Sequence, residues 1–227
     1  MANLTLAQDV VRRLGAPRMQ AALLTLVDPF RSVDALPLSL AAAWEETPAY
    51  GMPAPQLLLR AAAHLQPPPS PGWSKTLPAA VQHAVDRPAW PGVTTGPAFL
   101  SAWLNRLRIP STVKVDWPAL RAAAAEPGCA VDALCAVTLA PLDPPEAAMA
   151  RGALLDRMDS RTLDGPGAVL ALESALLGTL GPRDRFNRRA REYVATMQDP
   201  VSGLWPAPAE DSVEVTFFAL LLLMRGG

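Results

Sequence analysis

The placement of proline constrains this chain more than any other feature of its sequence. The 25 prolines lie between blocks rich in alanine and leucine, and they are not gathered into one polar tract. Proline is tolerated in the first turn of a helix but breaks a helix interior, so this spacing is typical of short helices separated by turns. Alternating runs of Val, Ile, Thr and aromatic residues are short, which argues against strands. We therefore predict an all-α protein.

Proline and glycine together delimit a series of helices with a regular rhythm of roughly eighteen to twenty residues per helix and loop. Several helices begin at a polar cap, such as Asp184 or Ser212, which suits the unpaired amides of a first turn. This rhythm predicts stacked helical hairpins. The predicted helices are 6–14, 17–26, 36–45, 55–65, 77–85, 96–107, 117–125, 130–138, 145–157, 167–180, 184–197 and 212–225.

A proline-rich stretch at residues 66–72 divides these helices into two groups. It is stiff and polar enough to be a linker between an N-terminal helical segment, 1–66, and a repeat region, 73–227. The alternative, which we favour, is a surface loop within one domain. A chain of 227 residues with 50% hydrophobic residues is long enough to bury a single core.

Charge and hydropathy exclude several kinds of partner. The 20 basic and 21 acidic residues nearly cancel, so no strong field attracts nucleic acid or an anionic membrane surface. The longest apolar run, 215–224, is about half of the roughly 20 residues that span a bilayer. The first residues do not have the pattern of a secretion signal. We expect a cytoplasmic protein without a membrane span, whose partner is a small apolar molecule.

The sequence does not predict a metal site at the two cysteines. Cys129 and Cys135 lie on different faces of a predicted helical stretch, and the two histidines, His64 and His83, are in other segments. A zinc site requires more thiolate or imidazole ligands close together. We therefore expect reduced core cysteines, no metal and no cofactor.

The most specific pattern in the chain lies between Arg189 and Trp205. Basic, small, aromatic, aliphatic, Gln, Gly and Trp positions follow in order at Arg189, Ala190, Tyr193, Val194, Gln198, Gly203 and Trp205. This pattern resembles the QW repeat of squalene-hopene and oxidosqualene cyclases, in the superfamily of terpenoid cyclases and protein prenyltransferases. The resemblance is strong over residues 163–227 and weaker upstream. It implies stacked helical hairpins that form a complete or partial α-α toroid.

In the QW repeat, the Gln, Gly and Trp residues are a structural clamp. A helix that ends near Gln198 leaves carbonyls unpaired, and the next helix leaves amides unpaired at its start. The resemblance implies that the amide of Gln198 bridges these termini, that the ring of Trp205 stacks over it, and that Gly203 permits a close turn. The clamp predicts a fold and not a reaction.

The acidic signature of the cyclases is missing from this chain. In class II cyclases the middle acid of Asp-x-Asp-Asp, kept protonated, protonates an alkene in an apolar cavity. Neither that sequence nor Asp-Asp-x-x-Asp occurs here. The candidate proton donors are Asp211, Glu210 and Glu173. Because Glu173 lies inside an apolar helix, it is either exposed on a polar face, which we favour, or a buried acid with a raised pKa.

Candidate ligand-binding residues are aromatic side chains and acids at helix starts. Trp103, Phe99 and Phe217 are the aromatic residues that we expect in an apolar pocket. Asp164 and Glu214 either ring the mouth of a barrel or stabilise a helix dipole, and we favour the second role. The arginines between 183 and 191 fall on one helix, where a solvated outer face is favoured over a diphosphate site.

Two functions remain open at this point. The first is a cyclase-like helical barrel that binds an isoprenoid or polyketide-like ligand and, if it is an enzyme, catalyses acid-initiated cyclisation or rearrangement. The second is a non-catalytic helical-repeat module that binds a protein partner, which predicts an exposed apolar groove. A homodimer is compatible with both.

Overall fold

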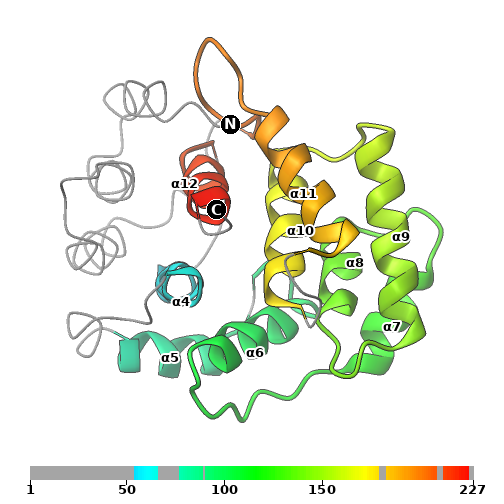
Figure 1. The fold of residues 1–227 in the computed structure, drawn as a ribbon. Coiled ribbons are helices and arrows are strands. Elements are labelled where there is room, and N and C mark those ends of the chain that lie inside the picture. Colours follow the sequence, from blue (N-terminus) through cyan, green and yellow to red (C-terminus); the bar gives the residue numbers. More distant parts are fainter. Residues whose placement is uncertain (1–53, 66–76, 89, 179–182, 209–211, 225–227) are drawn as a thin grey trace.

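A computed structural model describes residues 54–65, 77–88, 90–178, 183–208 and 212–224 of the chain, and within these residues it has nine helices and no strands (Figure 1). The helices are α4 (Ala54–His64), α5 (Leu77–Asp86), α6 (Gly96–Arg106), α7 (Trp117–Ala125), α8 (Val131–Thr138), α9 (Pro145–Asp159), α10 (Gly165–Leu177), α11 (Arg185–Thr196) and α12 (Ser212–Met224). The all-α prediction is confirmed for these residues. The helices predicted at 6–14, 17–26 and 36–45 lie outside them.

Helix starts follow the local signals of the sequence closely. The carboxylates of Asp116, Asp164 and Asp184 accept hydrogen bonds from backbone amides in the first turns of α7, α10 and α11. Helix α10 begins two residues before its predicted start at Gly167, because Asp164 is the cap and the following proline occupies the first turn. It ends at Leu177, three residues before the predicted end.

Alternate helices form a closed circuit of contacts. Helices α4, α6, α8, α10 and α12 each pack against the next in this order, and α12 packs back against α4. The intervening helices pack on members of this circuit: α5 on α4, α7 and α9 on α8, and α11 on α10 and α12 (Figure 1). Although α4 precedes the proline-rich stretch, its residues Leu57, Leu58 and Leu59 belong to the same hydrophobic cluster as the later helices. The described part of 1–66 therefore shares a core with the repeat region.

Helix α12 is the most apolar of the described helices, and it is buried. Phe217, Phe218 and Leu220 are completely inaccessible to solvent, and Val213 and Val215 are nearly so. It has 13 residues, and none of the described helices is long and apolar enough to cross a membrane. Burial against α4, α10 and α11 accounts for its composition.

Trp205 connects α11 to α12. Its indole N–H donates to the carbonyl oxygen of Val194 in the last turn of α11 at 2.7 Å, and its backbone N–H donates to Oγ1 of Thr216 in α12 at 3.3 Å. The side-chain amide of Gln198 donates to the carbonyl oxygen of Gly203 at 3.1 Å. Gly203 has a φ of 74°, which glycine adopts without strain. Trp205 thus contacts both helices, while Gln198 and Gly203 form the turn between them.

Candidate functional site

Glu173 lies at the centre of a buried charge cluster, and its side chain is 0% exposed. Its Oε1 accepts hydrogen bonds from Nε1 of Trp103 and from Nε2 of His64, both at 2.9 Å. Its Oε2 accepts from Nε and Nη2 of Arg60, both at 2.7 Å. Four donors from α4 and α6 therefore satisfy one carboxylate on α10.

The guanidinium of Arg60 is held by aromatic rings as well as by carboxylates. It lies 4.3 Å from the ring centre of Trp90 and 3.7 Å from that of Phe218. Its Nη1 is 3.6 Å from Oε1 of Glu214, at the start of α12. Cation–π contacts of a desolvated arginine contribute about 2 kcal/mol each. Arg60, on α4, therefore links α10 and α12 through one buried positive charge.

The cluster keeps Glu173 ionised. Burial alone would raise the pKa of this carboxyl group, but the positive charge of Arg60 and the hydrogen bond from His64 outweigh burial and lower the pKa to about 2. The expectation that Glu173 is exposed is wrong, and so is the alternative of a buried acid with a raised pKa. The physical reason is that α4 supplies Arg60 and His64 from 113 and 109 residues away along the chain. In this arrangement Glu173 holds no proton to donate at neutral pH.

The other candidate acids have different environments. Asp164 is exposed, and its carboxylate accepts a hydrogen bond from the backbone N–H of Gly167 at 2.9 Å, as a helix cap does. Glu214 is buried beside Arg60 in the first turn of α12. Asp211 and Glu210 lie outside the described residues.

The three predicted pocket aromatics, Trp103, Phe99 and Phe217, are all completely buried. The rings of Trp103 and Trp90 are stacked, with their centres 6.0 Å apart, and Phe99 meets the edge of Trp90 at 6.2 Å. Phe217 packs edge-on against Phe218 at 5.1 Å. These rings form the apolar wall of the charge cluster.

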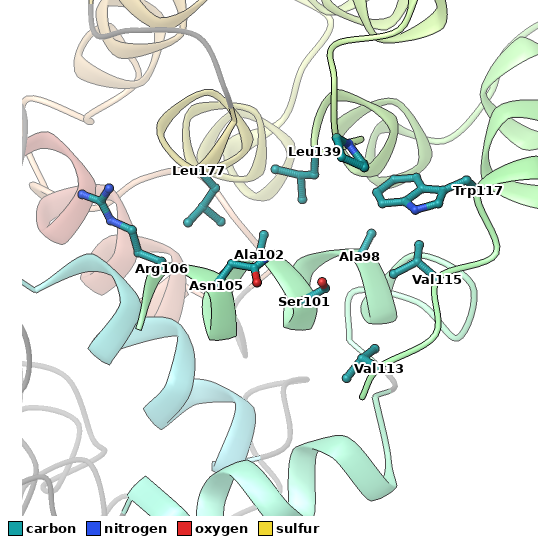
Figure 2. A pocket seen from close by; sticks show the side chains of 11 residues that line it. Ala98, Ser101, Ala102, Asn105, Arg106, Val113, Val115, Trp117, Leu139 and Leu177 are labelled. Atoms are coloured by element: carbon teal, nitrogen blue, oxygen red, sulfur yellow. The ribbon is translucent and has the colours of Figure 1, made fainter. Parts of the chain in front are cut away.

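A cavity of about 470 Å³ lies on the other side of α6 (Figure 2). Its walls come from α6, from the chain between α6 and α7, and from the C-terminal ends of α8 and α10. It is lined by Ala98, Ser101, Ala102, Asn105, Arg106, Val113, Val115, Trp117, Leu139, Pro141 and Leu177. None of the residues predicted to bind a ligand is among them. A cavity of this size falls within the range of small-molecule sites, roughly 300–1,000 Å³.

Small residues on one face of α6 make room for the cavity. Ala98, Ser101, Ala102 and Asn105 recur at the three- and four-residue spacing of a single helical face. Because Ala98, Ser101 and Ala102 have small side chains, a space remains between this face of α6 and the wall opposite it. Figure 2 shows this row below the open space, with Leu139 and Leu177 above it.

The chain between α6 and α7 supplies an apolar wall. From Val113 to Trp117 partly buried residues alternate with exposed ones, which is the two-residue period of extended backbone. Val113, Val115 and Trp117 therefore point to one side and line the cavity, whereas Lys114 and Asp116 point to solvent. This alternation is visible in the sequence and was the signal that could have located the site.

The charge cluster holds two walls of the cavity in position. Trp103 and Ala102 are neighbours on α6, and Trp103 bonds Glu173 while Ala102 lines the cavity. Leu177, one turn after Glu173 on α10, lines the cavity as well. The hydrogen bond between Trp103 and Glu173 therefore fixes the distance between the helices that carry opposite walls.

Several arginines of helix α11 lie at the surface of the protein. Arg185 and Arg188 are exposed, and Arg189 forms an ion pair with Asp159 at 2.8 Å. Arg191 donates to the carbonyl oxygen of Leu223 at 2.8 Å. These contacts agree with the favoured interpretation of a solvated helix face.

Thiol and metal chemistry have little support among the residues that the structure describes. No group of three or more His, Cys, Asp or Glu side chains in this part of the chain is arranged to hold a metal ion. Cys129 and Cys135 are both free, and burial raises the pKa of the Cys135 thiol. A buried thiol of raised pKa is a poor nucleophile.

Comparison with protein-family models, with curated proteins and with solved structures found no match to this chain. The geometry of the charge cluster and of the cavity is therefore the basis on which a function can be inferred for this chain.

Proposed function

We propose that this protein is a toroid-like helical protein that binds a small molecule with a largely apolar body, of isoprenoid or polyketide type. The closed circuit of α4, α6, α8, α10 and α12, with the other helices packed outside it, supports the toroid-like arrangement. The QW-like segment that ends at Trp205 supports it independently.

The observation that carries the proposal is the cavity between α6 and residues 113–117. Its volume of about 470 Å³ is combined with walls of Val, Leu, Pro, Ala and Trp side chains and with three polar side chains, those of Ser101, Asn105 and Arg106. Ligand sites in proteins have this composition, because an apolar lining supplies affinity and a few polar groups fix orientation.

Binding has more support than acid-initiated cyclisation. That reaction requires a carboxylic acid that is protonated before the substrate arrives. Glu173 does not meet this requirement, since Arg60 and His64 hold it as a carboxylate. Glu210 and Asp211 stay as the candidate donors of a cyclase hypothesis, and both lie outside the described residues.

The proposal is tested by filling the cavity. Ala102→Phe places a ring in the space between the walls, whereas Ala148→Phe adds the same ring at an exposed position of α9. Isothermal titration with farnesol, geranylgeraniol and a planar aromatic polyketide should give binding to the wild-type protein and to Ala148→Phe. Ala102→Phe should bind at least tenfold more weakly, with an unchanged circular dichroism spectrum.

Two results would overturn the proposal. One is the absence of binding by every member of this panel to the wild-type protein. The other is equal affinity of the wild-type protein and the Ala102→Phe variant, since a ligand that occupies this cavity has to compete with the added ring. If the titrations instead yield a stable complex with a polypeptide and none with small molecules, the partner-binding module is the better account.

A further inference from the structure

The cavity has one charged residue in its lining, and that residue is a cation. Arg106 stands at one end of the cavity and Trp117 at the other (Figure 2). No acidic side chain lines the space between them. An anion placed beside Arg106 would therefore meet no opposing carboxylate in the lining.

Arg106 differs from the engaged arginines of this fold. Arg60 and Arg189 are paired with carboxylates, and Arg157 donates to the carbonyl oxygen of Cys129. Within the part of the chain that the structure describes, the guanidinium of Arg106 has neither an ion pair nor a hydrogen bond. A guanidinium presents five N–H donors in a planar fork that matches a carboxylate or a phosphate.

Two neutral polar groups stand on the same wall. The hydroxyl of Ser101 and the side-chain amide of Asn105 line the cavity on the face of α6 that leads to Arg106. Neither side chain is hydrogen-bonded to another of the described residues. These groups can donate to the oxygens of a bound anion, and the rest of the lining is mostly apolar.

The floor of the cavity sets the length of the ligand. From Ala98, beneath Trp117, to Arg106 the helix α6 makes just over two turns, about 12 Å at 1.5 Å per residue. A ligand that reaches from the indole of Trp117 to the guanidinium therefore has an apolar body close to that length, with its polar group at one end.

We propose that the cavity takes an amphipathic anion, with its apolar body against Trp117 and Val115 and its anionic group against Arg106. This inference rests on the proposed function, because it names the class of ligand for the same cavity. The anionic group is a carboxylate or a phosphate, which Arg106 recognises through the same fork of donors.

The test compares three ligands of equal chain length: decanoate, decyl phosphate and the neutral decanamide. Each is titrated into the wild-type protein at low ionic strength, below the critical micelle concentrations of the anions. We expect at least one anion to bind tenfold or more tightly than decanamide, and the anion that does so distinguishes carboxylate from phosphate. Arg106→Gln should remove this preference while leaving the affinity for decanamide unchanged.

Arg108→Gln is the matched control, because Arg108 is exposed as Arg106 is, lies two residues further on and does not line the cavity. It makes the same change in net charge, and it should retain the preference for the anion. Loss of the preference in Arg108→Gln to the same extent as in Arg106→Gln would show a general effect of charge and would overturn the inference.

The test separates the failure of this inference from the failure of the proposed function. If decanoate, decyl phosphate and decanamide bind the wild-type protein equally, and Ala102→Phe weakens all three, the cavity binds apolar molecules but does not select an anion. If none of the three binds and the neutral isoprenoids and polyketide also fail, both proposals are wrong.

Discussion

Replacing Glu173 by glutamine should destabilise the protein strongly, because it removes one charge from a buried pair and keeps the shape of the side chain. Arg60 is 3% exposed and would keep only the more distant carboxylate of Glu214, at 3.6 Å. Removing one partner of a buried ion pair typically costs about 3–5 kcal/mol. The lowering of the Glu173 pKa from 4.5 to about 2 corresponds to about 3 kcal/mol, which agrees with that range.

Urea unfolding followed by tryptophan fluorescence measures this loss at pH 7. In a thermal melt, 3 kcal/mol corresponds to a fall in Tm of roughly 6–12 °C for a chain of this size. Asp159→Asn is the control, because Asp159 pairs with Arg189 at the surface and its side chain is 56% exposed. Such a pair contributes about 0–1 kcal/mol.

The difference between wild type and Glu173→Gln should also depend on pH. The pKa of Glu173 is lower in the folded than in the unfolded protein, so its contribution to stability is complete above pH 4.5 and is lost as the pH falls towards 2. At pH 3 the difference should be about half of its value at pH 7. A variant within 1 kcal/mol of wild type at pH 7, or a difference that is the same at both pH values, would refute the argument.

Three further predictions concern packing and reactivity. Trp205→Phe keeps an aromatic ring but loses the larger indole and its hydrogen bond to Val194, and should lower the free energy of unfolding by at least about 1–2 kcal/mol in urea; an unchanged midpoint would contradict this. Gly165→Ala should destabilise, because a Cβ there would overlap the backbone carbonyl oxygen of Pro206. Gly152→Ala meets nothing within 4 Å and should stabilise α9 by about 0.5–1 kcal/mol, and the opposite order of melting temperatures would contradict the packing of these two glycines. In a Cys129→Ser background, which removes the partly exposed thiol, Cys135 with its raised pKa should react with Ellman's reagent at pH 8 only after unfolding in urea, and rapid labelling of that folded variant would contradict its burial.

Helix positions were predictable because their signals are local. Asp116 and Asp184 cap the helices that begin directly after them, and proline occupies the first turn of six of the described helices. Each of the nine described helices was expected within three residues of its observed ends. The error at the start of α10 arose because Gly165 and Pro166 were taken as breakers, although Asp164 caps the helix and a proline is tolerated in its first turn.

The surroundings of Glu173 could not be predicted, because no local pattern encodes them. The position of Glu173 on α10 does not indicate whether its side chain is buried, because this helix is apolar on nearly all sides and buried on most of them. Its partners Arg60 and His64 are one turn apart on α4, a spacing that places two polar groups on one face of an Ala/Leu-rich helix. That pair was the available clue to a buried acid elsewhere in the chain.

The cavity was also missed, for a different reason. The search for a ligand site was directed at the large aromatic residues, and Phe99 and Trp103 are part of the core. The informative positions were the small residues on the opposite face of α6 and the alternating apolar residues from Val113 to Trp117. Space in a protein interior is produced by small side chains, so a stripe of them beside an extended apolar segment is the better indicator.

The long sequence separation between Arg60 and His64 on α4 and Glu173 on α10 also affects when the charge cluster can form during translation. During synthesis Arg60 and His64 emerge long before Glu173, which follows them by 113 and 109 residues. At a translation rate of about 5–20 residues per second, that interval lasts roughly 6–20 s. Throughout it, Arg60 lacks both of the carboxylates with which it pairs in the folded protein, Glu173 of α10 and Glu214 of α12. The buried charge cluster can therefore assemble only after α10 and α12 have left the ribosome and the circuit can close.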